Sequence, residues 1–123
     1  MFKIFKFGKK TQKEDLKNIT PEKAFSLVNE NKNNSNLVIL DVRTPIEYGD
    51  GHLEGSKNID YKSNNFKKVI EEMDKTKTYI LYCRSGVRSA KSYDIMKKLN
   101  FTDVYNVEGG IKGWMKKGLP IVK

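Results

Sequence analysis

The sequence predicts an α/β fold with a mainly parallel central sheet and helices on both of its faces. Three short apolar runs rich in branched and aromatic residues alternate with segments whose apolar residues recur at helical spacing. Such runs are typical of strands buried on both faces of a parallel sheet. Two segments that carry charged residues follow two of these runs, and parallel sheets hold their functional residues outside the carboxyl ends of strands. We therefore expect those two segments to form one site.

The first predicted helix begins after Thr20, because a threonine followed by Pro21 is a typical helix start. An apolar stripe at helical spacing follows: Ala24, Leu27 and Val28. The polar stretch 29–36 then predicts a surface loop, and the run 37–40 is the first predicted buried strand.

Two more strands are predicted at residues 78–82 and 104–107. Helical spacing recurs twice between the strands, in Phe66, Val69, Ile70 and Met73, and in Ala90, Tyr93, Met96 and Leu99. Asn100 is placed to end the second of these helices, and Trp114 is expected to anchor a last helix in the core. This alternation favours right-handed crossovers between parallel strands.

A chain of 123 residues fits one domain, and we expect a basic tail at 1–18 and a folded domain at 19–123. No stretch approaches the roughly 20 apolar residues of a membrane span, and the first ten residues lack the apolar core of a signal peptide. A single cysteine cannot form an internal disulfide. The expected protein is a cytoplasmic monomer without a membrane span.

The formal net charge of +9 raises the possibility of nucleic-acid binding. Four of these excess charges belong to residues 1–18, and the other five are spread over 105 residues without a basic stripe. We therefore expect no nucleic-acid partner. The alternating lysines and apolar residues of 1–7 leave open a contact of the tail with an acidic partner or a membrane surface.

Arginine is scarce, with three residues among 24 basic ones, and all three lie in the two segments that follow predicted strands: Arg43, Arg84 and Arg88. A planar guanidinium is needed where an anion or a loop must be held in fixed geometry, whereas lysine suffices on a solvated surface. These arginines therefore mark the expected site.

The segment from Cys83 to Ser89 leads from a predicted strand into a predicted helix. Backbone N–H groups of a tight turn and of a first helical turn can all point at one anion there, and Gly86 permits the backbone angles of such a turn. Most lone cysteines are small buried hydrophobes. Two arginines and a glycine within five residues favour a thiolate instead, with a lowered pKa and nucleophilic character.

Four residues separate Cys83 from Arg88, and two further motifs lie within 39–59 and 107–114. In these three spaced motifs the chain resembles the rhodanese family of sulfurtransferases, whose active loop also has four residues between its cysteine and arginine. The segments 39–43, 47–48 and 51–59 resemble the family's first signature, and 107–114 resembles its closing signature. The resemblance covers about residues 19–122, and its departures are mild, with Leu53 and Ser56 in place of the more common isoleucine and alanine.

The resemblance implies a sulfurtransferase that works through a Cys83 persulfide, with neither cofactor nor metal. Its sulfur donor is expected to be thiosulfate, a persulfide or a polysulfide, and its acceptor cyanide or an external thiol, including a protein thiol. The residues expected to bind donor and persulfide form one loop: Arg84, Ser85, Gly86, Val87, Arg88 and Ser89. Arg84 is expected to steer an anionic donor, and Ser89 is a candidate both for a donor to the sulfur and for the helix cap.

Four residues are expected to support the loops: Asp41, Arg43, Glu47 and His52. Arg43 and Glu47 are expected to form an ion pair, and Arg88 is expected to bond loop carbonyls more than substrate. His52 is assigned to loop packing, since sulfur transfer from thiosulfate needs no general base once the thiol is ionised. Gly109 and Gly110 resemble a phosphate-binding turn only weakly.

Two alternatives come from other functional classes. A Cdc25-like phosphatase or arsenate reductase shares the fold, but its loop holds five residues between cysteine and arginine, and the shorter loop here suits a sulfur atom better. A non-catalytic interaction module of the same fold often loses the nucleophile, whereas this chain keeps Cys83 and both loop arginines.

Overall fold

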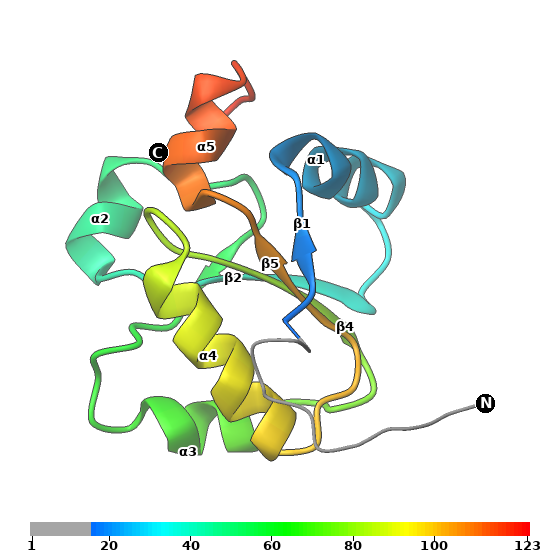
Figure 1. Ribbon diagram of the computed structural model, residues 1–123, viewed down its shortest axis with the longest axis vertical. Helices are drawn as coiled ribbons and strands as arrows, with labels where there is room; N and C mark the ends of the chain where they lie inside the picture. The colour runs from blue at the N-terminus through cyan, green and yellow to red at the C-terminus, as the bar shows by residue number, and fades with distance from the viewer. Residues whose placement is uncertain (1–15) are drawn as a thin grey trace.

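The computed structural model describes residues 16–123. Its centre is a five-stranded sheet with the order β1-β5-β4-β2-β3, in which all strands run parallel (Figure 1). The strands are β1 (Asn18–Ile19), β2 (Leu37–Asp41), β3 (Lys57–Asn58), β4 (Thr78–Tyr82) and β5 (Val104–Val107). The predicted fold class is therefore confirmed.

The three long strands lie where the sequence predicts them, with β2 one residue longer. The two edge strands, β1 and β3, were not predicted, because two residues are too few to carry a periodic pattern. The expected boundary between tail and domain falls inside β1, where the carbonyl of Lys17 already accepts a hydrogen bond from the N–H of Asn106. The rest of the expected tail, residues 1–15, lies outside the described residues.

Residues 16–123 form five helices: α1 (Pro21–Glu30), α2 (Pro45–Asp50), α3 (Phe66–Glu71), α4 (Val87–Lys98) and α5 (Gly110–Lys116). The first four connect successive strands, and α5 follows β5. Thr20 caps α1 as predicted, with its hydroxyl accepting from the N–H of Lys23 at 3.1 Å. Asn100 follows the end of α4 with φ +74°, the left-handed conformation that ends many helices. Among the described residues, no helix is long and apolar enough to cross a membrane.

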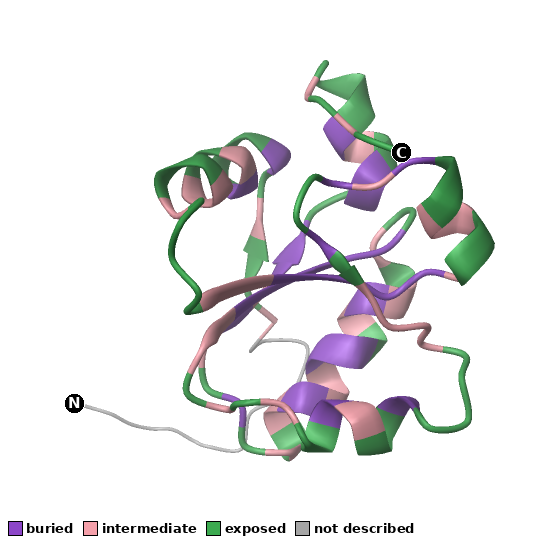
Figure 2. Ribbon diagram, turned by 180° about the vertical axis from the view of Figure 1, so that it is seen from behind, coloured by how far each residue is buried: buried purple, intermediate pink, exposed green. Residues whose placement is uncertain are grey.

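Each face of the sheet carries its own core, because successive side chains of a strand point to opposite faces. Leu40 and Leu81 pack with α3 and α4 on one face, whereas Ile39 and Ile80 pack with α1 and α5 on the other. Figure 2 shows the buried residues running along the central strands and the inner sides of the helices. Trp114 of α5 is 3% exposed, and its Nε1 donates to the carbonyl of Pro120 at 2.8 Å, so it anchors the second core as expected.

Candidate active site

Cys83 follows β4 directly and lies at the carboxyl end of the sheet. Its side chain is 1% exposed, and its Sγ accepts hydrogen bonds from the N–H of Gly86 at 3.1 Å and from the N–H of Ser89 at 3.4 Å. The hydroxyl of Ser89 also donates to Sγ, at 3.4 Å. We call the loop from Cys83 to Ser89, with its donors turned toward this sulfur, the cup.

The balance of burial and hydrogen bonding lowers the pKa of Cys83. Burial alone raises the pKa, because a thiolate is poorly solvated inside a protein. The hydroxyl and N–H of Ser89, with the N–H groups of Gly86 and Ser85, outweigh that effect and leave the pKa below its ordinary value. The cup is therefore suited to hold a sulfur anion.

The start of α4 explains how the donors converge. Gly86 is the N-cap residue of α4 with φ +109°, a conformation that favours glycine. The N–H groups of Gly86 and Ser89 thereby face the sulfur, and α4 directs the positive end of its dipole toward it. Ser89, a candidate for the cap, lies within the first turn and donates to Sγ instead.

The outer side of the cup is held by the first turn of α5. The N–H of Ile111 donates to the carbonyl of Cys83 at 2.8 Å, and the N–H of Lys112 donates to the carbonyl of Arg84 at 3.0 Å. Gly110 makes this approach possible, since a Cβ there would lie 2.5 Å from both carbonyl oxygens. Gly110 thus lets α5 brace the cup, a role that the weak resemblance to a phosphate-binding turn did not indicate.

Arg88 does not bond the loop carbonyls, and Glu47 does not pair with Arg43; both expectations are wrong. Arg88 forms a two-pronged ion pair with Glu47, with N–O distances of 2.8 and 3.0 Å. A capping box explains the choice of partner, because Thr44 and Glu47 exchange hydrogen bonds at the start of α2 and fix the carboxylate toward α4. The hydrogen bonds from Arg88 lower the pKa of Glu47 to about 2.

Arg43 pairs with Asp41 instead, and both side chains are buried. Its guanidinium donates to both carboxylate oxygens and, at 2.6 Å, to the carbonyl of Gly51. The hydroxyl of Tyr82 donates to Asp41 at 2.7 Å and accepts from the N–H of Leu53 at 3.0 Å. Burial, together with the charge of Asp41, raises the pKa of Tyr82, so its hydroxyl keeps its proton as a donor.

Sequence reasoning missed Tyr82, although its place at the end of a buried strand beside Cys83 was a usable signal. Among the described residues, His52 forms no hydrogen bond with the sulfur of Cys83. Its ring stacks on Tyr48 with centroids 3.7 Å apart, and its Nδ1 is 2.8 Å from the carbonyl of Tyr48. Arg84 and Ser85 are exposed at the mouth of the cup, as is Val87.

A groove of about 290 Å³ runs beside the cup. It is lined by residues of α2, α5, the loop after β4 and the C-terminal segment, among them Glu47, Arg84, Lys112, Met115 and Ile121. The groove connects the exposed guanidinium of Arg84 with the surface of α5.

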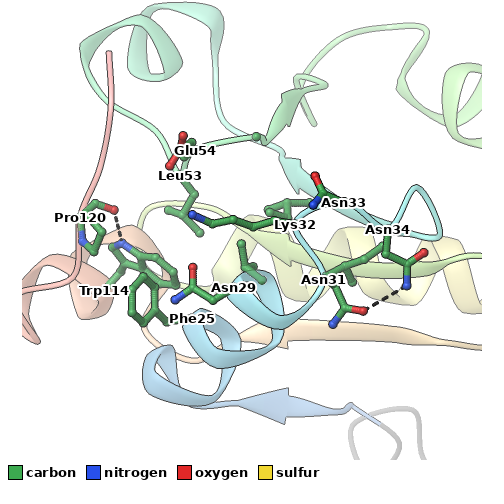
Figure 3. A pocket seen from close by; sticks show the side chains of 14 residues that line it. Phe25, Asn29, Asn31, Lys32, Asn33, Asn34, Leu53, Glu54, Trp114 and Pro120 are labelled. Carbon is green, nitrogen blue, oxygen red and sulfur yellow. Dashed lines mark hydrogen bonds between the residues drawn. The ribbon is translucent and has the colours of Figure 1, made fainter.

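A larger cavity of about 380 Å³ lies elsewhere, between α1 and the loop that contains Leu53 and Glu54 (Figure 3). Phe25 and Trp114 form an apolar wall, and Asn29 and Lys32 line another part of the cavity. No residue of the cup lines it. Within residues 16–123, no group of three or more potential ligating side chains could hold a metal ion.

A parallel sheet whose central strand ends in a cysteine held by a ring of N–H donors defines an α/β protein with a thiol-centred anion site. A family model described as the rhodanese-like domain matches residues 25–117, and the chain belongs to this family. Its membership confirms the resemblance carried by the three motifs.

Three relatives illustrate the similarity. The chain is 34% identical over 84 residues to the probable adenylyltransferase/sulfurtransferase MoeZ of Mycobacterium tuberculosis, which covers 68% of this chain and 21% of that longer protein. It is 27% identical to the thiosulfate sulfurtransferase GlpE of Glaesserella parasuis, over 88% of this chain and 94% of that protein. A crystal structure of a rhodanese-like domain protein from Staphylococcus aureus shares 31% identity with a TM-score of 0.68, covering 88% of this chain and all of the other. Sulfur transfer is thus a named activity among its relatives.

Proposed function

We propose that this protein is a sulfurtransferase that carries sulfane sulfur as a persulfide on Cys83. The cup is the observation that carries the proposal, because it surrounds one sulfur atom with hydrogen-bond donors and lowers the pKa of the thiol. The names of MoeZ and GlpE support the same reaction class. GlpE also supports thiosulfate as the assay donor.

In the first half-reaction, the thiolate of Cys83 attacks the outer sulfur of thiosulfate. A new S–S bond forms to Sγ while the S–S bond of thiosulfate breaks, and sulfite leaves with the electron pair. The exposed guanidinium of Arg84 attracts the dianionic donor to the mouth of the cup. The N–H groups of the cup then stabilise the persulfide anion.

In the second half-reaction, an external nucleophile attacks the outer sulfur. Cyanide becomes thiocyanate, or a thiolate becomes a persulfide, and Cys83 departs as a thiolate. The sequence holds no second cysteine, so the chain itself cannot supply the accepting thiol. Ping-pong kinetics follow from this order.

The size of the cup favours sulfur over phosphate. Four residues separate Cys83 from Arg88, and the N–H groups of Gly86 and Ser89 already lie within 3.4 Å of Sγ. Arg88 is engaged by Glu47 through both terminal nitrogens rather than turned to an oxyanion. A phosphatase would need a wider ring and a free guanidinium.

Cys83→Ser tests the proposal. We expect the variant to fold and to lose all thiosulfate:cyanide sulfurtransferase activity. Incubation of the wild-type protein with thiosulfate should add one sulfur atom to the intact mass, and dithiothreitol should remove it. Activity that persists in the variant, or a mass that does not change, would reject a Cys83 persulfide; hydrolysis of a phosphate ester without any sulfur adduct would favour the phosphatase class.

Arg84→Ala tests donor binding. We expect the KM for thiosulfate to rise about two- to fivefold with little change in kcat, because solvent screens the attraction between the exposed guanidinium and the donor anion. Lys98→Ala, an exposed change at the far end of α4, is the matched control. An unchanged KM would remove Arg84 from the donor site.

A further inference from the structure

Within the described part of the chain, the large hydrophobic side chains that are exposed belong to elements around the cup. Residues 16–123 expose four large hydrophobic side chains: Ile46 at 79%, Val87 at 61%, Met115 at 50% and Val122 at 39%. Single exposed apolar residues are common and need no explanation, but a cluster beside a site marks a contact surface. All four lie at the edge of the molecule that holds the cup.

Local contacts place each of them there. Ile46 and Val87 each precede one partner of the ion pair between Glu47 and Arg88, and this side-chain pair links α2, which holds Ile46, to the start of α4, which holds Val87. Met115 lines the groove beside the cup. Val122 pairs with His52 next to the groove residue Ile121.

The elements that carry these residues are neighbours in the fold. The loop that leads into α4 lies between α2 and α5 (Figure 1). Ile46 belongs to α2, Val87 to α4 and Met115 to α5, so three adjoining elements bring apolar residues to the surroundings of the cup. We call Ile46, Val87, Met115 and Val122 the apolar rim.

The charges of the groove are positive on balance. Arg43 and Glu47 are neutralised by Asp41 and Arg88. Arg84 and Lys112 therefore face a single remaining acid, Asp50. In the described part of the chain neither Arg84 nor Lys112 has an ion-pair partner. The full chain, with a net charge of +9, adds a long-range attraction for acidic molecules.

We propose that the apolar rim and the groove dock a cysteine-bearing segment of an acidic partner protein, whose thiol accepts the sulfur from Cys83. The proposal rests on the proposed function and names its acceptor. Cyanide or a small thiol would touch only the mouth of the cup. A polypeptide with apolar and acidic side chains would also cover the rim and meet Arg84 and Lys112.

The transfer is balanced without any further reactant. The partner's thiolate, having lost its proton to water, attacks the outer sulfur of the Cys83 persulfide. One S–S bond forms to the partner as the bond to Sγ breaks, and Cys83 takes the electron pair as a thiolate. The partner leaves as a persulfide, and the cup is ready for the next donor.

The experiment uses the full chain, loaded with sulfur by thiosulfate, and three synthetic peptides of equal length with one central cysteine. The first peptide flanks the cysteine with aspartate and leucine, the second with lysine and leucine, and the third with aspartate and serine. Mass spectrometry follows the peptide persulfide over time. We expect the first peptide to accept sulfur roughly tenfold faster than either of the others.

Two sets of variants locate the effect. Lys112→Glu should slow transfer to the first peptide several-fold, and Lys98→Glu, at the far end of α4, should not. The double variant Ile46→Ser and Met115→Ser should also slow transfer to this peptide. Transfer to cyanide should stay unchanged in Lys98→Glu and in the double variant. Lys112→Glu, at a residue whose N–H braces the cup, is compared with the lysine peptide instead, and transfer to that peptide should not be slowed.

The outcomes separate the two proposals. Equal rates for the three peptides, or equal effects of Lys112→Glu and Lys98→Glu, would overturn the docking surface while leaving the persulfide intact. The absence of any sulfur adduct before a peptide is added would overturn the proposed function, and with it the docking of an acceptor.

Discussion

The neighbouring strands β2 and β4 end side by side, so the loops that follow them begin at the same end of the sheet. The polar groups of the two loops nevertheless have different partners. After β2, the charges of Asp41 and Arg43 are buried and saturated by each other, by Tyr82 and by the carbonyl of Gly51. After β4, several N–H groups converge on the single atom Sγ of Cys83, and Arg84 stays exposed. The loop after β2, whose charged groups all have partners, therefore supports the structure. The loop after β4, whose N–H groups converge on one sulfur, forms the candidate site.

This difference explains why two charged segments of similar appearance in the sequence have different tasks. The buried ion pair fixes the loop after β2 because leaving either charge unpaired would be costly. The cup gains its rigidity from outside, through α5 and through the ion pair between Arg88 and Glu47. Its inner donors therefore stay available to a sulfur anion.

The largest effect is expected where α5 holds the cup. Gly110→Ala would push a methyl group to 2.5 Å from the carbonyl oxygens of Cys83 and Arg84. We expect a loss of about 3 kcal/mol or more in the free energy of unfolding, measured by urea denaturation. Gly118→Ala is the matched control, since Gly118 has a similar positive φ of +74° but no atom within 4 Å of its Cβ position. It should cost about 1–2 kcal/mol; equal losses would show that α5 does not clamp the cup.

Tyr82→Phe tests the hydrogen bonds that hold the loop after β2. The change removes a donor to the buried carboxylate of Asp41, the acceptor of the Leu53 N–H and a partner of the Ser56 hydroxyl. Because three buried groups lose a partner, we expect a loss of about 2–4 kcal/mol in the free energy of unfolding. Tyr79→Phe removes one hydrogen bond, to the carbonyl of Asp74, and should cost about 1 kcal/mol. If Tyr82→Phe lost no more stability than Tyr79→Phe, the hydroxyl of Tyr82 would not hold the loop after β2.

Glu47→Gln tests the link between α2 and the cup. Loss of the two-pronged pair with Arg88 should cost about 1–2 kcal/mol at neutral pH. The folded pKa of Glu47, about 2, lies below the value of about 4.3 for an unfolded chain, so the pair stabilises the protein above the higher value. The stability difference between wild type and variant should shrink as the pH falls from about 4 toward 2. A difference independent of pH would show that the ion pair is not its source.

Ser89→Ala has the smallest expected effect, and it acts on the pKa of Cys83. The hydroxyl of Ser89 donates to Sγ, so its removal should raise the pKa of the thiol and move the pH dependence of persulfide formation upward. Thiolate absorbance, measured against the corresponding Cys83→Ser background, follows the titration. Ser92→Ala is the control, because its equally buried hydroxyl donates to the carbonyl of Arg88 instead. A pKa raised equally by both changes would deny Ser89 a specific role.

The sequence predicted the fold and the loop of donors around Cys83 because both depend on local patterns. Strands such as 78–82 are read from a run of apolar residues, and the cup from a glycine and donors within a few positions of Cys83. The wrong expectations, an ion pair of Arg43 with Glu47 and hydrogen bonds of Arg88 to loop carbonyls, both depend on where Glu47 points. Glu47 and Arg88 are 41 positions apart, and nothing local tells whether Arg43 turns to Asp41 or to Glu47. The brace at Gly110 depends on the same kind of distant contact.

The peptide group between Arg84 and Ser85 faces in two directions at once. Its N–H, which belongs to Ser85, is one of the groups that lower the pKa of Cys83, and its carbonyl, which belongs to Arg84, accepts a hydrogen bond from the N–H of Lys112. Each hydrogen bond polarises the other, so the group is already oriented before any charge arrives. The hydrogen-bond donors of the cup are thus oriented when the chain folds. A negative charge on the sulfur can therefore form or disappear without reorganisation of its surroundings.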